Sequence, residues 1–235
     1  MAAISLGPRR VEPEWLDELP ADDPRAVRSR RDLKRINGWM LQASIMTRLL
    51  HAYRDGPPRR IVELGAGDGT FMLAVARRLA KRWPHVTLTF VDRQNIVAAK
   101  THDAFRALGW RTESVSADVF AFLGSSEERT DIITANLFLH HFSDEALRRL
   151  FAGVAGMAPL FVACEPSRSQ SALLGSHLLF AIGCNDVSRH DAVVSVRAGF
   201  RSEELSAHWP QRHRWHLNER AVPPFTHCFV ARRHV

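Results

Sequence analysis

Short apolar runs alternate with amphipathic stretches from residue 61 to about residue 164. Runs of β-branched and apolar residues predict strands, and apolar positions at helical spacing predict helices. The expected strands are 61–64, 86–91, 112–116, 131–135 and 160–164, and the expected helices are 71–82, 96–108 and one from Ser143, as its cap, to about 154. Strands that alternate with helices of this length indicate an α/β protein with a parallel, doubly wound sheet.

The amino-terminal part shows a different pattern. Residues 1–23 are rich in proline and mixed in charge, which predicts an arm or a short helix. A helical pattern begins at Pro24, a residue suited to the first helical position, with Asp22 and Asp23 as candidate caps. It runs to about Arg54, and Gly38 could break it.

The carboxyl-terminal part adds a helical stretch and a hairpin. The helical pattern covers 167–206, and two strand-like runs at 215–220 and 225–231 flank a proline turn. The sheet should therefore finish with an antiparallel strand. We expect one structural unit made of an N-terminal arm and helical cap at 1–55 and a main domain at 56–235.

Composition excludes several classes of protein. Of the 235 residues, 46% are hydrophobic and 24% are charged, which is the balance of a globular domain. The longest apolar stretch, 172–184, is shorter than the roughly 20 residues of a membrane span, and residues 1–23 do not resemble a signal peptide. Cys164, Cys184 and Cys228 are few and widely spaced, so we expect a cytoplasmic protein with no disulfide framework and no metal site.

The charge is strongly basic. The chain has 32 Lys and Arg residues against 25 Asp and Glu residues. The basic residues of the first long helix lie on one side of it. Such a surplus suits a nucleic acid, an acidic small molecule or an acidic carrier protein. The charge alone does not decide between these partners.

The strongest motif follows the first expected strand. Residues 61–70 read IVELGAGDGT, a glycine loop between a strand and a helix. Glycines there allow a tight turn and close approach of a ligand to the backbone. Thr70 stands where a dinucleotide fingerprint has its third glycine, and the loop lacks the Gly-Lys-Ser/Thr of a phosphate-binding loop. Glu63 would repel a pyrophosphate, but it would attract an amino group or a sulfonium.

Acidic residues also end the next two strands. Asp92, which Arg93 follows, is placed to accept hydrogen bonds from ribose hydroxyls. Asp118 could bind an exocyclic amine, with Val119 and Phe120 against an adenine ring. Each aspartate could instead merely cap the helix that follows it. Three such sites at the carboxyl ends of three successive strands are more specific than any one alone.

In these motifs the chain resembles class I S-adenosylmethionine-dependent methyltransferases, over about residues 60–165 and the terminal hairpin. The resemblance implies a seven-stranded Rossmann-like sheet of order 3-2-1-4-5-7-6, with 56–235 as the methyltransferase domain and a substrate cover at 167–211, between the fifth and sixth strands. It implies S-adenosylmethionine as cofactor and S-adenosylhomocysteine as product. The expected cofactor residues are Glu63, Gly65, Ala66, Gly67, Asp92, Arg93, Asp118, Val119 and Asn136. Trp39 and Met40 could close the same site from the other side.

The end of the fourth strand carries a candidate for the chemistry. Residues 137–145 read LFLHHFSDE, similar to a stretch of the caffeic-acid-type hydroxyl O-methyltransferases. In that family a histidine at the position of His140 is the general base, whereas His141 stands where the family has an acid. Glu165, at the end of the fifth strand, is the natural group to orient the imidazole. His140 and His141 could instead simply begin a helix, with catalysis by proximity.

The acceptor is the least determined part. Methyl transfer is an in-line displacement, and an imidazole can take the proton of a phenol as the new bond forms. We therefore expect O-methylation of an aromatic or polyketide-like hydroxyl. A looser resemblance of 32–37 and of His190-Asp191 to methyltransferases encoded beside polyketide synthases favours the same acceptor. His190 could face it, but a helix start capped by Ser188 or Asp191 is the more ordinary interpretation.

Two alternatives to this function remain open. An RNA or other nucleic-acid methyltransferase fits the charge, although the fourth-strand motif lacks the Asn-Pro-Pro-aromatic clamp of base-methylating enzymes. A non-catalytic S-adenosylmethionine-binding relative would share the fold. The sequence also leaves open whether oxygen, nitrogen or carbon is methylated, which of the three histidines acts as base, and the oligomeric state.

Overall fold

Seven strands form a single sheet in the computed structural model, which describes residues 6–20, 22–54, 56–125 and 129–234. The strand order is β3-β2-β1-β4-β5-β7-β6, which confirms the predicted order. β1 to β5 run parallel, and β7 is antiparallel to both of its neighbours. The bounds are β1 Arg60–Leu64, β2 Thr87–Asp92, β3 Arg111–Ser116, β4 Ile132–Asn136, β5 Leu160–Pro166, β6 Trp215–Val222 and β7 Thr226–Arg233.

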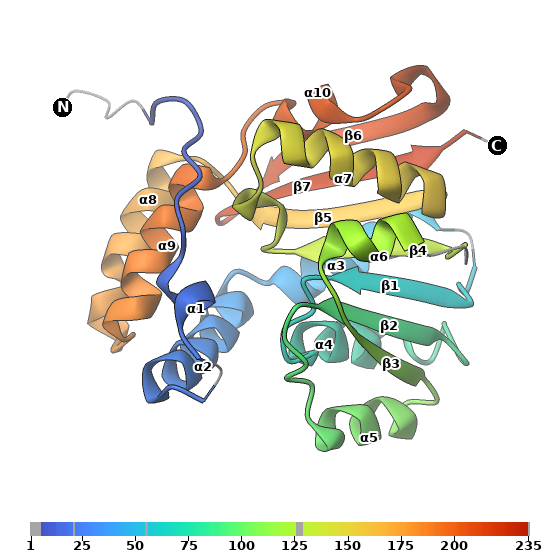
Figure 1. Ribbon diagram of the computed structural model, residues 1–235, viewed down its shortest axis with the longest axis horizontal. Helices are drawn as coiled ribbons and strands as arrows, with labels where there is room; N and C mark the ends of the chain where they lie inside the picture. Colours follow the sequence, from blue (N-terminus) through green and yellow to red (C-terminus); the bar gives the residue numbers. More distant parts are fainter. Residues whose placement is uncertain (1–5, 21, 55, 126–128, 235) are drawn as a thin grey trace.

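Helices cover both faces of the sheet (Figure 1). One apolar core lies between the sheet and α3 Gln42–Tyr53, α4 Thr70–Leu79 and α5 Ala99–Ala107. The other lies between the sheet and α6 Val119–Ser125, α7 Asp144–Met157 and α10 Glu204–His208. Every residue of β5 is buried because both of its faces are covered, whereas β3 is mostly exposed at one edge of the sheet.

A further group of helices gathers at the end of the sheet toward which the parallel strands point (Figure 1). It consists of α1 Trp15–Glu18, α2 Pro24–Trp39, α8 Gln170–His177, the short 3₁₀ helix η2 Leu178–Ile182, and α9 Asp186–Ala198. Two more 3₁₀ turns, η1 Leu139–His141 and η3 Arg212–Arg214, follow β4 and precede β6. The N-terminal segment and the segment 170–198 between β5 and β6 therefore meet above the carboxyl ends of the parallel strands.

The structure corrects two predicted helices. The helix expected at 24–54 is two helices, and it breaks at Met40 and Leu41 rather than at Gly38, which lies inside α2. Leu41 adopts a left-handed φ of 55° and begins α3. The stretch expected at 167–206 is divided into α8, η2, α9 and α10.

The caps were predicted partly correctly. Asp23 caps α2 by accepting a hydrogen bond from Arg25 N, and Ser143 caps α7, as expected. The cap of α9 is Asn185, so the prediction of Ser188 or Asp191 was wrong. Those two side chains have other partners, which lie in the N-terminal part of the chain.

Two general expectations can be set beside the structure. No helix among the described residues combines the length and the apolar character that crossing a bilayer requires. The three cysteines are free and buried, with Cys164 and Cys228 opposite one another on β5 and β7.

Candidate active site

A cavity of about 550 Å³ lies between the carboxyl ends of the strands and the helices that gather there. Ligand sites in doubly wound sheets occupy this position. Predicted site residues that line it are Glu63, Gly65, Ala66, Gly67, Asp92, Arg93, Val119, Asn136 and His140. Glu165 lies directly behind this lining, and Asp118 is outside it.

The glycine loop needs its glycines for two different reasons. Gly65 has φ 69°, and a Cβ there would lie 2.2 Å from the ring of Phe138. Gly67 has φ 54°, but a Cβ there would meet open space. A side chain at Gly65 would therefore displace its neighbour, whereas one at Gly67 would strain only the backbone and narrow the cavity.

Two oxygen atoms beside this loop lack partners. Glu63 is buried, and its Oε2 has no hydrogen-bond partner among the described residues, nor has Oδ1 of Asn136. Burial raises the pKa of Glu63 well above its usual value, and the charges of Asp92 and Asp68 raise it further. An unpartnered buried carboxylate is costly. This corner of the cavity therefore suits a ligand that brings positive charge or N–H donors.

The two predicted ribose and adenine contacts differ in their surroundings. Asp92 lines the cavity, and its carboxylate accepts hydrogen bonds from Gly67 N and Gln94 N, both at 2.9 Å. Asp118 instead accepts a hydrogen bond from Phe120 N at 2.9 Å, so it caps the next helix. Its role in binding an adenine remains a prediction.

Helix α2 closes the cavity over the glycine loop. Nζ of Lys34 lies 2.5 Å from Oδ2 of Asp68, which joins the helix to the loop. Trp39 and Met40, expected to close the site, both line the cavity. The first long helix is therefore part of the binding site and not only a basic surface.

The structure brings His140 and Glu165 together. Nδ1 of His140 lies 2.8 Å from Oε2 of the buried Glu165 carboxylate. Glu165 also accepts hydrogen bonds from the backbone N–H groups of Phe138, Leu139 and His140. One carboxylate thus holds both the η1 turn and the ring that the turn carries.

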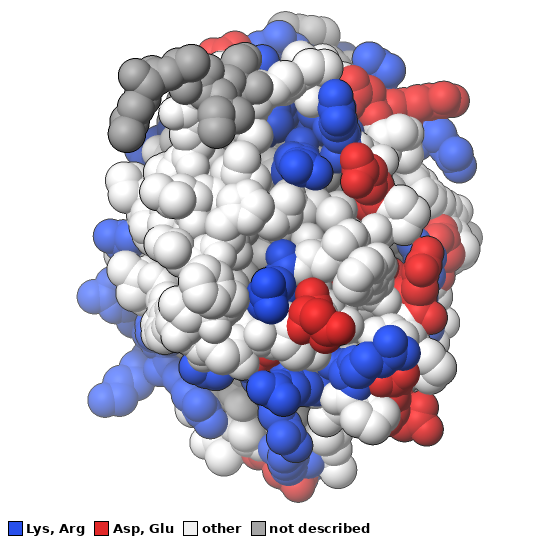
Figure 2. Space-filling model, turned by 90° about the vertical axis from the view of Figure 1, so that its left-hand side faces the viewer, with Lys and Arg blue, Asp and Glu red and all other residues white. Residues whose placement is uncertain are grey.

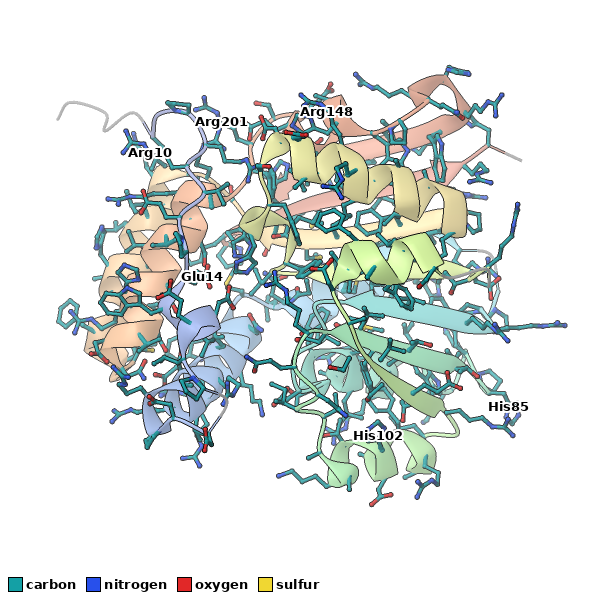
Figure 3. The ribbon with its side chains drawn as sticks, in the orientation of Figure 1. Arg10, Glu14, His85, His102, Arg148 and Arg201 are labelled. Carbon is teal, nitrogen blue, oxygen red and sulfur yellow. The ribbon has the colours of Figure 1, made fainter. Side chains whose placement is uncertain are left out.

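The other ring nitrogen of His140 has a partner that the sequence did not indicate. Nε2 lies 3.2 Å from Oε1 of Glu14, which comes from the N-terminal arm (Figure 3). Glu14 is also buried and lines the cavity. No local pattern separates it from its acidic neighbours Glu12 and Asp17, and it is 126 positions from His140 in the sequence.

This pairing sets the protonation of His140. Burial lowers the pKa of the imidazole, but the hydrogen bonds and charges of Glu14 and Glu165 outweigh it and raise the pKa to about 10. Burial raises the pKa of Glu14, and the contacts with His140 outweigh it, so that pKa falls to about 2. At neutral pH His140 is therefore an imidazolium between two carboxylates, and both of its N–H groups are donated.

The other two candidate histidines have different surroundings. His141 lines the cavity, with Nδ1 3.3 Å from Oδ2 of Asp17, and its pKa is lowered by burial and by the charge of His140. His190 is not part of the cavity lining. Its ring stacks on Trp15 at 3.8 Å, and its Nδ1 bonds to Asp191. His190 therefore contacts the arm, not the space for an acceptor.

One group of side chains could hold a metal ion. Among the residues that the structure describes, Glu14, His140 and His141 place ligand atoms within 4.8 Å of one another. Glu14 and His140 already neutralise each other as an ion pair, which accounts for their contact without a cation. We therefore interpret the group as a proton-bearing pair.

A comparison with protein families finds a match in the central region. Residues 61–158 match a family described as a methyltransferase domain. This region is similar to methyltransferase domains. It contains β1 to β4 and the glycine loop, so the unpartnered oxygens of Glu63 and Asn136 belong to it.

Relatives with known names agree with this domain. A ribosomal protein L11 methyltransferase of Rhodopseudomonas palustris is 37% identical over 89 residues, which are 36% of this chain and 28% of that protein. Two solved structures share the fold. The plantazolicin methyltransferase BpumL in complex with SAH has TM-score 0.65 and 13% identity, over 91% of this chain and 92% of that one. The mitomycin 7-O-methyltransferase MmcR has TM-score 0.61 and 19% identity, over 92% and 60%.

The residues of the matched region fit S-adenosylmethionine. That molecule carries a cationic amino group and a sulfonium, which suit the unpartnered Glu63 carboxylate and the Asn136 oxygen. The left-handed backbone at Gly65 and Gly67 leaves room for a ligand against the loop. The chain spans about a quarter of the length of the L11 methyltransferase and three fifths of that of MmcR.

Proposed function

We propose that this protein transfers a methyl group from S-adenosylmethionine to a hydroxyl oxygen of a small molecule. The observation that carries the proposal is that groups suited to the cofactor and a candidate general base meet at one cavity. The carboxylate of Glu63 and the loop around Gly65 suit the cofactor, and His140 with Glu165 stands on the neighbouring strand ends. Strand β4 lies between β1 and β5, so His140, which follows β4, is close both to Glu165 and to the loop that follows the first strand.

The proposed chemistry needs little from the protein besides alignment and a place for one proton. S-adenosylmethionine supplies, when bound, a methyl group on a good leaving group. The chain aligns the acceptor oxygen and removes its proton. His140 is the candidate base, and Glu165 fixes its ring and stabilises the imidazolium that forms. His140 acts in this way only when Glu14 has left Nε2 and the ring has released its proton.

The lining of the remaining cavity supports an apolar acceptor. Side chains of α1, α2, η2 and the hairpin turn contribute, namely Leu16, Leu33, Leu179, Ile182 and Phe225. Among the apolar residues of 167–211, Leu179 and Ile182 line the cavity, while Val194 and Phe200 are not part of the lining and Phe180 is exposed. An aromatic or polyketide-like molecule matches such walls. MmcR is by its name an O-methyltransferase, which agrees with oxygen as the methylated atom.

A nucleic-acid substrate has less support. Three basic side chains of α2 are engaged within the chain: Arg28 and Arg35 donate to backbone carbonyls of Gly183 and Ile182, and Lys34 pairs with Asp68. Figure 2, which faces the helical cover, shows a broad region without charged side chains rather than a continuous basic surface. The same contacts leave the expected docking of an acidic carrier protein on α2 without support.

The proposal is tested in two steps. Calorimetry should detect S-adenosylmethionine and S-adenosylhomocysteine, each at one site per chain. Incubation with a panel of phenols and enols should then release S-adenosylhomocysteine and add the mass of one methylene group to an acceptor. Failure to bind either nucleoside would overturn the cofactor, and methylation of amines but not hydroxyls would overturn the acceptor class. Salt-dependent binding to RNA with methylation of a base would favour the alternative.

A further inference from the structure

A single oxygen atom in the cavity receives two donors from the fold. Oε1 of Glu14 accepts a hydrogen bond from Nε2 of His140 at 3.2 Å and another from Oγ of Ser195 on α9. All three residues line the cavity, and Glu14 is 9% exposed. The two donors come from different elements, η1 and α9, so they converge on this oxygen through the fold rather than through one local motif.

The arm holds Glu14 in this position by contacts on both sides of it. The carboxylate of Asp191 accepts hydrogen bonds from the backbone N–H groups of Trp15 and Leu16. Trp15 stacks on His190, and Arg9 donates to the carbonyl of Phe142 at 2.6 Å. These partners lie on α9 and beside η1, whereas the arm is not part of the sheet. Glu14 is thus delivered from outside the methyltransferase domain.

We propose that Oε1 of Glu14 occupies the subsite of the acceptor oxygen, and that Ser195 is the second residue that binds that oxygen. This inference rests on the proposed function and adds to it the atoms that hold the hydroxyl. Glu14 is then a positioning residue, because its carboxylate takes the place of the acceptor oxygen until an acceptor binds. Binding of the acceptor requires the arm to withdraw Glu14 from His140 and Ser195.

The exchange has a definite proton balance. With Glu14 in place, His140 keeps protons on both nitrogens. When Glu14 leaves, only the carboxylate of Glu165 still stabilises the imidazolium. Nε2 of His140 then releases its proton to water. An acceptor hydroxyl then donates to Nε2 and accepts from Ser195. As the oxygen–methyl bond forms and the sulfur–methyl bond breaks, the hydroxyl proton passes to Nε2 and the sulfur retains the electron pair.

The test uses a carboxylate as probe, because a carboxylate occupies the subsite in the native protein. Glu14→Ala removes the native occupant and leaves its two donors. Benzoate should bind this full-length variant in calorimetry at least tenfold more tightly than it binds the wild type. The double variant Glu14→Ala/Ser195→Ala should bind benzoate about tenfold more weakly than Glu14→Ala, the loss expected for one hydrogen bond to a charged group.

A matched control separates the subsite from general loosening of the arm. Glu12→Ala alters an exposed acid on the same arm and should bind benzoate no better than the wild type. If Glu14→Ala does not fold, the experiment uses Glu14→Gln instead. The uncharged amide of that variant is a weaker occupant of the subsite, so benzoate can compete with it. Equal affinity of the single and double variants, or no binding to Glu14→Ala, would overturn the proposal.

Two further outcomes are distinguishable. Stoichiometric zinc or manganese in the purified wild type, lost together with Glu14, would overturn the proposal by showing a metal centre at this group. S-adenosylhomocysteine binding is measured on the same variants and should be unchanged by Glu14→Ala. If these variants bind benzoate no differently from one another but still bind the nucleoside, the subsite alone is refuted. If the wild type does not bind the nucleoside, the proposed function is refuted.

Discussion

The two halves of the cavity are built in different ways. The half around β1 and β2 is made of backbone and short side chains that follow one another within residues 63–70, with Asp92 tied directly to the loop. The other half is made by single side chains from the arm, from η1 and from α9, joined by the ion pairs of His140 and by the hydrogen bond from Ser195 to Glu14. The first half is therefore fixed by steric limits, and the second by charge. Substitutions and pH should act on them in different ways.

The largest effect is expected in the charge-built half. Glu165→Ala leaves the His140–Glu14 pair with one carboxylate and removes the acceptor of three backbone N–H groups. Breaking a buried pair on one side costs about 3–5 kcal/mol. Urea unfolding should show a loss of this size, and Glu165→Gln should retain part of it through its amide oxygen. A loss below 1 kcal/mol would mean that the η1 turn does not depend on this carboxylate.

The sterically fixed half should respond to a single methyl group. Gly65→Ala combines a contact of 2.2 Å to Phe138 with a left-handed φ, and overpacking and strain together cost about 3 kcal/mol. Gly67→Ala, which meets open space, should cost about 1 kcal/mol. Thermal unfolding of both variants measures the difference. Equal losses would show that the Phe138 ring moves freely out of the way.

The pH dependence of the arm sharpens the contrast. The raised pKa of His140 means that its pairing contributes stability fully below about pH 6.5 and loses it as the pH rises toward 10. The lowered pKa of Glu14 means that the contribution is also lost as the pH falls from 4.5 toward 2. Glu14→Gln should therefore destabilise the protein by about 2 kcal/mol at pH 6. The two proteins should converge near pH 10, and a difference that stays constant with pH would contradict the pairing.

The smallest effect is expected at Glu63, where a substitution should raise the stability of the free protein but weaken cofactor binding. The raised pKa means that the ionised carboxylate destabilises the free protein increasingly as the pH rises above 4.5. Glu63→Gln should raise the stability of the free protein at pH 8 by about 1 kcal/mol and weaken S-adenosylmethionine binding about tenfold. Melting curves and calorimetry measure the two quantities on one preparation. A variant that loses stability would show that Glu63 has a partner in the free protein.

The sheet and one half of the site could be predicted because their signals are contiguous. The alternating patterns predict a parallel, doubly wound sheet, and the resemblance to class I methyltransferases implies its strand order. Glu63 and Gly65 lie in one ten-residue segment that includes the first strand and its loop. The approach of His140 to Glu165 also follows, because their strands are neighbours and end at the same edge.

The other half could not be predicted, because its contacts join distant parts of the sequence. Glu14 is one of several acids in the arm, and only the packing of the arm on α9 selects it for burial. Ser195 lies within α9 without any motif around it. The helix break at Leu41 was also not predicted, because Gly38 is the residue that local propensity favours as a breaker.

The stack of Trp15 on His190 gives the arm an optical signal of its own. The two rings lie 3.8 Å apart and nearly parallel, and Trp15 is partly exposed to solvent. An indole against an imidazole fluoresces differently from an indole in water, so the emission of Trp15 reports whether the arm is docked. Subtracting the spectrum of a Trp15→Phe protein isolates that emission from the other five tryptophans. Arm opening can then be followed in real time, without a label and before any acceptor is known.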